Sequence, residues 1–218
     1  ITGRLNSDRL RAIRRWTLAS WSIQMLGLIL GAWWAYHVLG WGGYWSWDPV
    51  ENAALLPWLT ATAFLHSTMV QERRGMLKVW NLGLVIASFA LSIFGTFEVR
   101  SGIISSVHSF AYSDIGAYFL VFLAIILIFS SSLFLLRLPT LRPEQEFDSV
   151  ISREGMFLFN NLLLLGITFA VLWGTIFPLI SAAVRQQTMT VGPPFYNQVI
   201  GPLAAILIVA MGIGPLLA

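Results

Sequence analysis

Six apolar stretches, separated by short polar connections, constrain the fold of this chain more than any other feature of its sequence. A helix of roughly 20 mainly apolar residues can cross the hydrocarbon core of a membrane while satisfying its own backbone hydrogen bonds. The sequence therefore predicts an all-α fold, a polytopic transmembrane bundle of about six helices. The predicted spans cover approximately residues 16–39, 53–70, 79–97, 115–136, 156–180 and 199–217.

Composition supports a single membrane-embedded domain. Of the 218 residues, 57% are hydrophobic and only 11% are charged, whereas soluble domains carry about 25% charged residues. The absence of cysteine excludes disulfides, thiolate metal sites and a cysteine nucleophile. No repeat or change in composition divides the chain, so we expect residues 1–218 to form part of one integral membrane domain. Since the chain opens on Ile1 and stops where an apolar segment ends, we expect a piece of a longer protein.

The basic residues lie mostly on one side of the predicted bundle. Only Arg100 and Arg185 fall on the other side, and the remaining eleven are Arg4, Arg9, Arg11, Arg14, Arg15, Arg73, Arg74, Lys78, Arg137, Arg142 and Arg153. Cytoplasmic connections of membrane proteins are enriched in Lys and Arg. We therefore expect a cytoplasmic N-terminal end, with the connections 40–52, 98–114 and 181–198 facing the outer compartment. Because membrane orientation explains the basic residues, we expect no nucleic-acid partner.

Residues 40–52 form a tryptophan-rich loop that reads WGGYWSWDPVEN from Trp41 onward. Its residues allow two interpretations. In the first, the aromatic rings anchor the loop at the membrane interface, and Asp48, Pro49 and Glu51 begin the next helix with a capping box. In the second, this density of flat rings binds a large, flat, apolar ligand with a polar edge, such as a porphyrin. Asn52 and the backbone N–H groups near the two glycines would then reach the polar substituents.

Three histidines are available as nitrogen ligands. His66 lies ~20 Å along the second span from the loop, and an ionisable residue inside a membrane is by default a functional hypothesis. We expect it to bind haem iron; the alternative is a hydrogen bond to another helix. His108 lies in the outer loop 98–114, where apolar residues at helical spacing predict an amphipathic helix lying flat on the membrane. We expect His108 to be a ligand rather than only an exposed interfacial residue, whereas His37 is expected to be interfacial.

Arg100 is one of the two basic residues on the outer side, which leaves two roles open. It pairs with a carboxylate of the ligand, such as a haem propionate, or it is an ordinary interface arginine.

Several stretches resemble one known family. WGGYWSWDPVENAALLPWL resembles the tryptophan-rich motif of haem-handling membrane proteins, and WDPVEN followed by PWL resembles the large haem lyase subunit, the F component, of the multi-component cytochrome c maturation pathway. TATAFLHSTMVQERRG is similar to the segment that bears a transmembrane haem b ligand, which falls on His66. GTFEVRSGIISSVHSFA resembles the segment with an axial ligand of the outer haem, which falls on His108. Tyr44 and Glu98 depart from the usual residues, which are tryptophan and an apolar residue.

The resemblance implies a function in cytochrome c biogenesis. The implied protein is a haem lyase component that presents haem at the outer face for thioether attachment to the CXXCH motif of apocytochrome c, with haem b at His66 for reduction. It implies that the second ligand of each haem lies outside this chain. A haem transporter or delivery protein of the same family without bond-making activity is the alternative, and a transporter of another flat aromatic ligand is a third.

The resemblance also implies a setting and partners. The setting is the bacterial inner membrane, or the mitochondrial inner membrane in an organelle. The partners are a haem chaperone, apocytochrome c and other maturation subunits, with a quinol as a candidate electron donor.

The predicted site combines the motif with the histidines. The expected catalytic residues are Trp45, Trp47, Asp48 and His108, and the expected metal ligands are His66 and His108. The expected cofactor-binding residues are Trp41, Gly42, Gly43, Tyr44, Trp45, Trp47, Asp48, Glu51, Asn52, His66, Arg100 and His108.

Overall fold

The computed structural model describes residues 7–40, 42–108, 113–141 and 152–216. Within these ranges, six helices are long and apolar enough to cross a membrane, and no strand is present, which confirms the predicted fold class. The helices are α1 (Ser7–Val38), α2 (Pro49–Arg74), α3 (Lys78–Ser101), α4 (Ile115–Arg137), α5 (Arg153–Arg185) and α6 (Pro193–Ile213). Two short 3-10 helices follow α4 and α6, namely η1 (Leu138–Thr140) and η2 (Gly214–Leu216).

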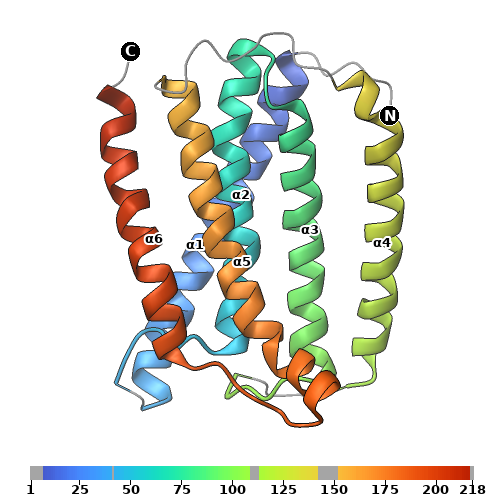
Figure 1. The fold of residues 1–218 in the computed structure, drawn as a ribbon, viewed down its shortest axis with the longest axis vertical. Helices are drawn as coiled ribbons and strands as arrows, with labels where there is room; N and C mark the ends of the chain where they lie inside the picture. The colour runs from blue at the N-terminus through green and yellow to red at the C-terminus, as the bar shows by residue number, and fades with distance from the viewer. Residues whose placement is uncertain (1–6, 41, 109–112, 142–151, 217–218) are drawn as a thin grey trace.

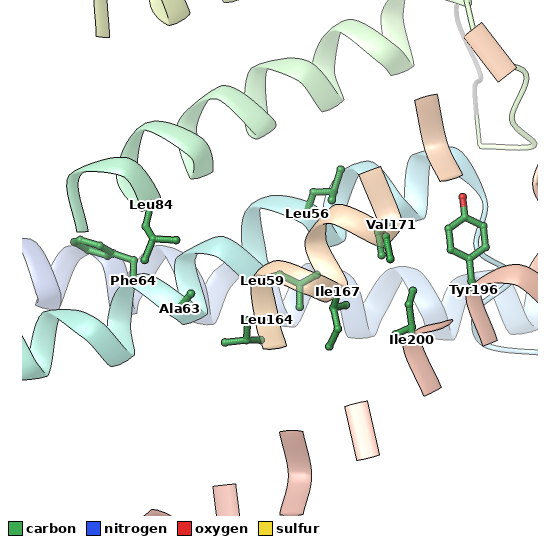
Figure 2. Packing of buried hydrophobic residues seen from close by; sticks show 11 residues of the cluster. Leu56, Leu59, Ala63, Phe64, Leu84, Leu164, Ile167, Val171, Tyr196 and Ile200 are labelled. Carbon is green, nitrogen blue, oxygen red and sulfur yellow. The ribbon is translucent and has the colours of Figure 1, made fainter. Parts of the chain in front are cut away.

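Helix α2 is the centre of the bundle. It packs against α1, α3 and α5, while α4 lies against α3 and α6 lies against α5 (Figure 1). The apolar core lies where α2, α5 and α6 meet, with Leu84 added from α3, and Figure 2 shows its side chains. Large apolar side chains remain exposed on the outer faces of α1, α4 and α6. This is the distribution expected where lipid rather than water surrounds the helices.

Local sequence signals set both ends of α2. The Asp48 side chain accepts a hydrogen bond from the backbone N–H of Val50, Pro49 is the first helical residue, and Glu51 completes the predicted capping box. Gly75 ends the helix with a φ of +66°, in the left-handed region that glycine adopts without strain. The interpretation of this stretch as a helix start is therefore confirmed, and it places Asp48 at the junction of the tryptophan-rich loop and α2.

Polar and small residues hold the neighbouring helices to α2. The Trp21 indole of α1 donates to the Thr62 hydroxyl at 2.8 Å and stacks on Trp58 with centroids 5.3 Å apart. On the α3 side, Gly95 allows close approach, because a Cβ there would lie 3.2 Å from the Cβ of Ala53. Hydrogen bonds and small residues are the main sources of helix association inside a membrane.

The three predicted outer connections lie at the same end of the bundle, opposite the first turn of α1 and the last turn of α6 (Figure 1). The prediction of an amphipathic helix in the loop 98–114 is wrong for residues 102–108, which form bends and a turn. Gly102, with a φ of +66°, ends α3 there, and the Ser106 hydroxyl bonds to Asp48 rather than to a helical carbonyl. Residues 109–112 lie outside the described ranges.

Candidate functional site

Trp47 fastens the tryptophan-rich loop to α6. Its ring stacks on Tyr196, with centroids 4.9 Å apart and planes 12° from parallel, and its indole N–H donates to Asn197 Oδ1 at 2.9 Å. The Trp47 backbone has a φ of +61°, which is uncommon for a residue other than glycine. The loop is therefore held in one conformation by a contact between residues about 150 positions apart in sequence.

Asn52 supports this loop from the protein interior. It is fully buried, and its Nδ2 lies 3.1 Å from the Trp47 carbonyl, 3.1 Å from Thr175 Oγ1 and 3.2 Å from the Tyr196 hydroxyl. These partners come from the loop, α5 and α6. The structure thus places Asn52 in an interhelical hydrogen-bond network.

His108 is held against the loop by a carboxylate. Its Nδ1 lies 3.0 Å from Asp48 Oδ2, and both side chains are largely buried. Ser106 links the two, because its hydroxyl donates to the same Oδ2 and accepts from the His108 backbone N–H at 3.0 Å. A carboxylate on one ring nitrogen fixes the orientation and tautomer of a metal-ligating histidine. The arrangement therefore points the opposite nitrogen, Nε2, away from Asp48.

A cavity of about 310 Å³ lies between α1 and the tryptophan-rich loop. Its volume is near the lower end of the range for small-molecule sites. One wall carries Gly27 and Gly31 of α1, where an added Cβ would meet nothing within 4 Å. The lining also includes Trp45 of the loop and His108. The complete lining is Gln24, Gly27, Leu28, Gly31, Ala32, Trp34, Trp45, Val50, Glu51, Ala54 and His108.

Two buried polar atoms belong to residues that line this cavity. Trp45 Nε1 and Glu51 Oε1 have no hydrogen-bond partner within the described part of the chain. By contrast, Glu51 Oε2 accepts from the backbone N–H groups of Ser46, at 2.9 Å, and Asp48, at 3.1 Å. An unpaired buried polar group is costly and calls for an explanation. The cavity combines an apolar lining, the His108 imidazole and two polar atoms without hydrogen-bond partners in the described residues. A flat apolar ligand with polar edge groups, as a porphyrin has, fits this combination.

The other predicted loop residues lie outside the cavity lining. Tyr44 stacks on Tyr36 of α1, with centroids 4.5 Å apart, and is exposed. Gly42 has a φ of +75°, which explains glycine in this turn, and Gly43 follows it. Arg100 is exposed in the last turn of α3. Trp41 lies outside the described residues.

His66 lines a second cavity at the opposite end of the bundle. This cavity measures about 350 Å³ and is lined by His66, Arg73, Arg153, Met156, Phe157, Asn160, Met211 and Gly214. The imidazole lies 5.8 Å from the Phe157 ring, and its buried Nδ1 has no hydrogen-bond partner in the described ranges. This lining suits a haem with its propionates. The histidine offers a nitrogen ligand, the methionine and phenylalanine side chains offer apolar contacts, and the two guanidinium groups can pair with the propionates. The predicted ligands His66 and His108 therefore line separate cavities.

Known proteins match this chain over nearly its whole length. The family model described as cytochrome C assembly protein matches residues 2–108. The cytochrome c-type biogenesis protein CycK of Bradyrhizobium diazoefficiens is 48% identical over 99% of this chain and 33% of its own length. CcmF of Pseudomonas aeruginosa is 45% identical over 98% of this chain and 33% of its own length. Residues 2–108 belong to the cytochrome c assembly protein family, and nearly the whole chain is homologous to CycK and CcmF.

A solved structure agrees with this membership. The cytochrome c heme lyase CcmF superposes with a TM-score of 0.72 and 38% sequence identity, covering 96% of this chain and 30% of that one. The resemblance inferred from the motifs is confirmed. The chain spans about one third of the length of the curated relatives it matches, which agrees with the prediction of a piece of a longer protein.

The sequence analysis missed three residues that contact His108 or the tryptophan-rich loop. Ser106 bridges Asp48 and His108, and its position two residues before the histidine was the available signal. Trp34 lies 5.8 Å from the His108 ring, on the α1 face that also carries Gly27 and Gly31. Spacing along GLILGAWW would have revealed that shared face. Tyr196 stacks on Trp47, but nothing near it in sequence indicates this partner.

Proposed function

We propose that this chain is the haem-presenting part of a cytochrome c haem lyase. The observation that supports this most strongly is the cavity beside the tryptophan-rich loop, whose lining combines His108, held by Asp48, with Gly27 and Gly31 of α1. In this proposal the loops 40–52 and 98–114 together form the haem site. The bound haem supplies the vinyl groups that form thioethers with the two cysteines of a CXXCH motif.

The residues of the chain position the reacting groups. Asp48 and Ser106 hold His108 so that its Nε2 would bind the haem iron, and Trp45 would give the porphyrin a flat apolar wall. Trp47 and Asn52 act from behind by fixing the loop to α5 and α6. Holding reactants in the right geometry supplies a large part of many rate accelerations. The second ligand of this haem would come from outside this chain.

We propose that the loop end faces the outer, periplasmic side of a bacterial inner membrane. The distribution of basic residues supports this orientation, because the opposite end carries Arg14, Arg73, Arg74 and Arg153. In this orientation the haem chaperone and apocytochrome c approach the tryptophan-rich loop, and the other maturation subunits share the membrane.

We propose that His66 ligates a resident haem b. Support comes from the second cavity, which joins His66 to Arg73 and Arg153, the residues suited to hold haem propionates. When bound, this haem supplies redox chemistry, with a membrane quinol as its electron donor. The function of the chain then combines haem presentation at one end with electron supply at the other.

The test compares two outer histidines in the full-length protein. We expect His108→Ala to lose non-covalent haem from the loop site and to abolish covalent attachment to a CXXCH apocytochrome. His37→Ala is the matched control, because His37 is exposed on α1 and its Nδ1 lies 2.9 Å from the Trp33 carbonyl oxygen of its own helix. Haem content is measured by the pyridine haemochrome, and covalent product by resistance to acid–acetone. Full attachment by the His108 variant would contradict the proposal, and haem that stays extractable with the unaltered protein would favour a carrier.

A further inference from the structure

Besides the exposed Asp114, three carboxyl side chains of the described residues lie at the loop end of the bundle, and they differ in their hydrogen-bond partners. Asp48 Oδ2 accepts from His108, Ser106 and the Val50 backbone. Glu98 is buried in the last turn of α3, outside the cavity lining. Glu51 lines the cavity, and its Oε1 is buried with no hydrogen-bond partner within the described ranges. Of the three, Glu51 is the carboxyl that combines access to the cavity with an unengaged oxygen.

The proposed reaction needs a proton to move within this cavity. Addition of a thiol to a vinyl group breaks the S–H bond, forms a C–S bond at the inner vinyl carbon and forms a C–H bond at the terminal carbon. The vinyl π pair becomes the new C–H bond, and no oxidant or reductant takes part. Separated charges are costly between apolar walls, since the local dielectric is low. A group that takes the proton from sulfur and delivers it to carbon removes that cost.

We propose that Glu51 is this proton carrier and therefore a catalytic residue. Its Oε1 accepts the thiol proton as the sulfur approaches the vinyl group, and then delivers the same proton to the terminal carbon. Glu51 ends as a carboxylate, as it began, so the step balances without another reactant. This inference rests on the proposed haem attachment.

The capping box makes Glu51 suited to this task. Its Oε2 is fixed by the backbone N–H groups of Ser46 and Asp48, so the carboxyl group has one held oxygen and one oxygen for the substrate. Glu51 and His108 line the same cavity, so the carboxyl and the proposed iron ligand face a shared space. A pre-positioned acid–base group contributes about 10²–10⁴-fold to a proton-transfer step.

Substitutions at Glu51 separate capping from proton transfer. Glu51→Gln keeps the side-chain length and the capping acceptor but cannot carry the proton. Glu51→Asp keeps the carboxyl group but shortens the side chain, which weakens the capping hydrogen bonds more than Glu51→Gln does. If Glu51 only caps α2, the Gln variant should attach haem faster than the Asp variant. If Glu51 transfers the proton, the Asp variant should attach haem faster than the Gln variant. Glu98→Gln is the matched control, because it makes the same carboxyl-to-amide change at another buried residue of the same end.

The experiment uses the full-length protein in membranes with its maturation partners. We expect Glu51→Gln to retain normal non-covalent haem, measured by visible spectrum and pyridine haemochrome, and to attach haem to a CXXCH apocytochrome at least about 100-fold more slowly. We expect Glu51→Asp to be faster than Glu51→Gln, and Glu98→Gln to match the unaltered protein.

Three results would overturn the inference. These are a normal attachment rate with Glu51→Gln, loss of its non-covalent haem, or an equal slowing with Glu98→Gln. A failure of the unaltered protein to form covalent product would instead refute the proposed lyase function, and is seen before any variant is compared.

Discussion

Replacing Asp48 by Asn isolates the effect of one negative charge on His108. Asp48 Oδ2 lies 3.0 Å from His108 Nδ1 and also accepts from Ser106 and Val50. The Asn carbonyl oxygen can take the same position and accept the same hydrogen bonds, and Asn caps helices about as well as Asp. The fold and the helix start are therefore expected to remain intact while the carboxylate charge is lost.

The expected cost follows from the role of Asp48 behind a ligating nitrogen. Loss of such an outer partner typically weakens metal binding about 10–100-fold, or about 1.4–2.7 kcal/mol. Ser106→Ala removes one hydrogen bond but leaves the charge, so a smaller loss of about 1 kcal/mol is expected. The assay is a haem titration of the purified full-length protein, stripped of haem at the outer site and followed by Soret absorbance.

A matched control is available at another helix start on the same side. Asp114 is the N-cap residue of α4, and its side chain makes no capping hydrogen bond. Asp114→Asn makes the same chemical change away from the cavity and is expected to leave haem affinity unaltered. Unchanged affinity in Asp48→Asn, or an equal loss in Asp114→Asn, would refute the argument that Asp48 acts through His108.

Three further predictions follow from the cavities and the core. His66→Ala should abolish the reduced b-type spectrum of the full-length protein; an unchanged spectrum would make His66 structural. Gly31→Leu should fill the outer cavity and block haem binding without unfolding, since a Cβ at Gly31 meets nothing within 4 Å, whereas Gly201→Leu, equally unobstructed on α6, should bind haem normally in the same titration. Gly174→Ala should lower thermal stability by about 1–3 kcal/mol, because its Cβ would lie 2.5 Å from the Tyr196 hydroxyl oxygen; an unaltered melting temperature would show that Tyr196 moves freely.

The helices and the start of α2 were predictable because their signals are local. Six apolar runs of spanning length require helices in a membrane, whatever their neighbours are. Asp48, Pro49 and Glu51 cap α2 through hydrogen bonds within a few residues of one another. The pairing of Trp47 with Tyr196 has no such signal, because it joins the loop to a helix near the other end of the chain.

One prediction from local sequence failed because a tertiary contact overrode the local pattern. Apolar residues at helical spacing after Gly102 predicted a helix, yet Ser106 and His108 bond to Asp48 instead. A tertiary hydrogen bond to a carboxylate, about sixty residues away in sequence, outcompeted a weak local propensity.

Sequence alone therefore determined the spans, the capped start of α2 and the family motifs, since each depends on residues within a few turns of one another. Only the tertiary structure decided which side chains face the cavity. Trp45 and Glu51 line it, whereas Trp47 and Asn52, from the same motif, fasten the loop to α5 and α6. The reason is that the direction of each loop side chain depends on how α1, α5 and α6 pack around the loop, and that packing is a property of the whole bundle.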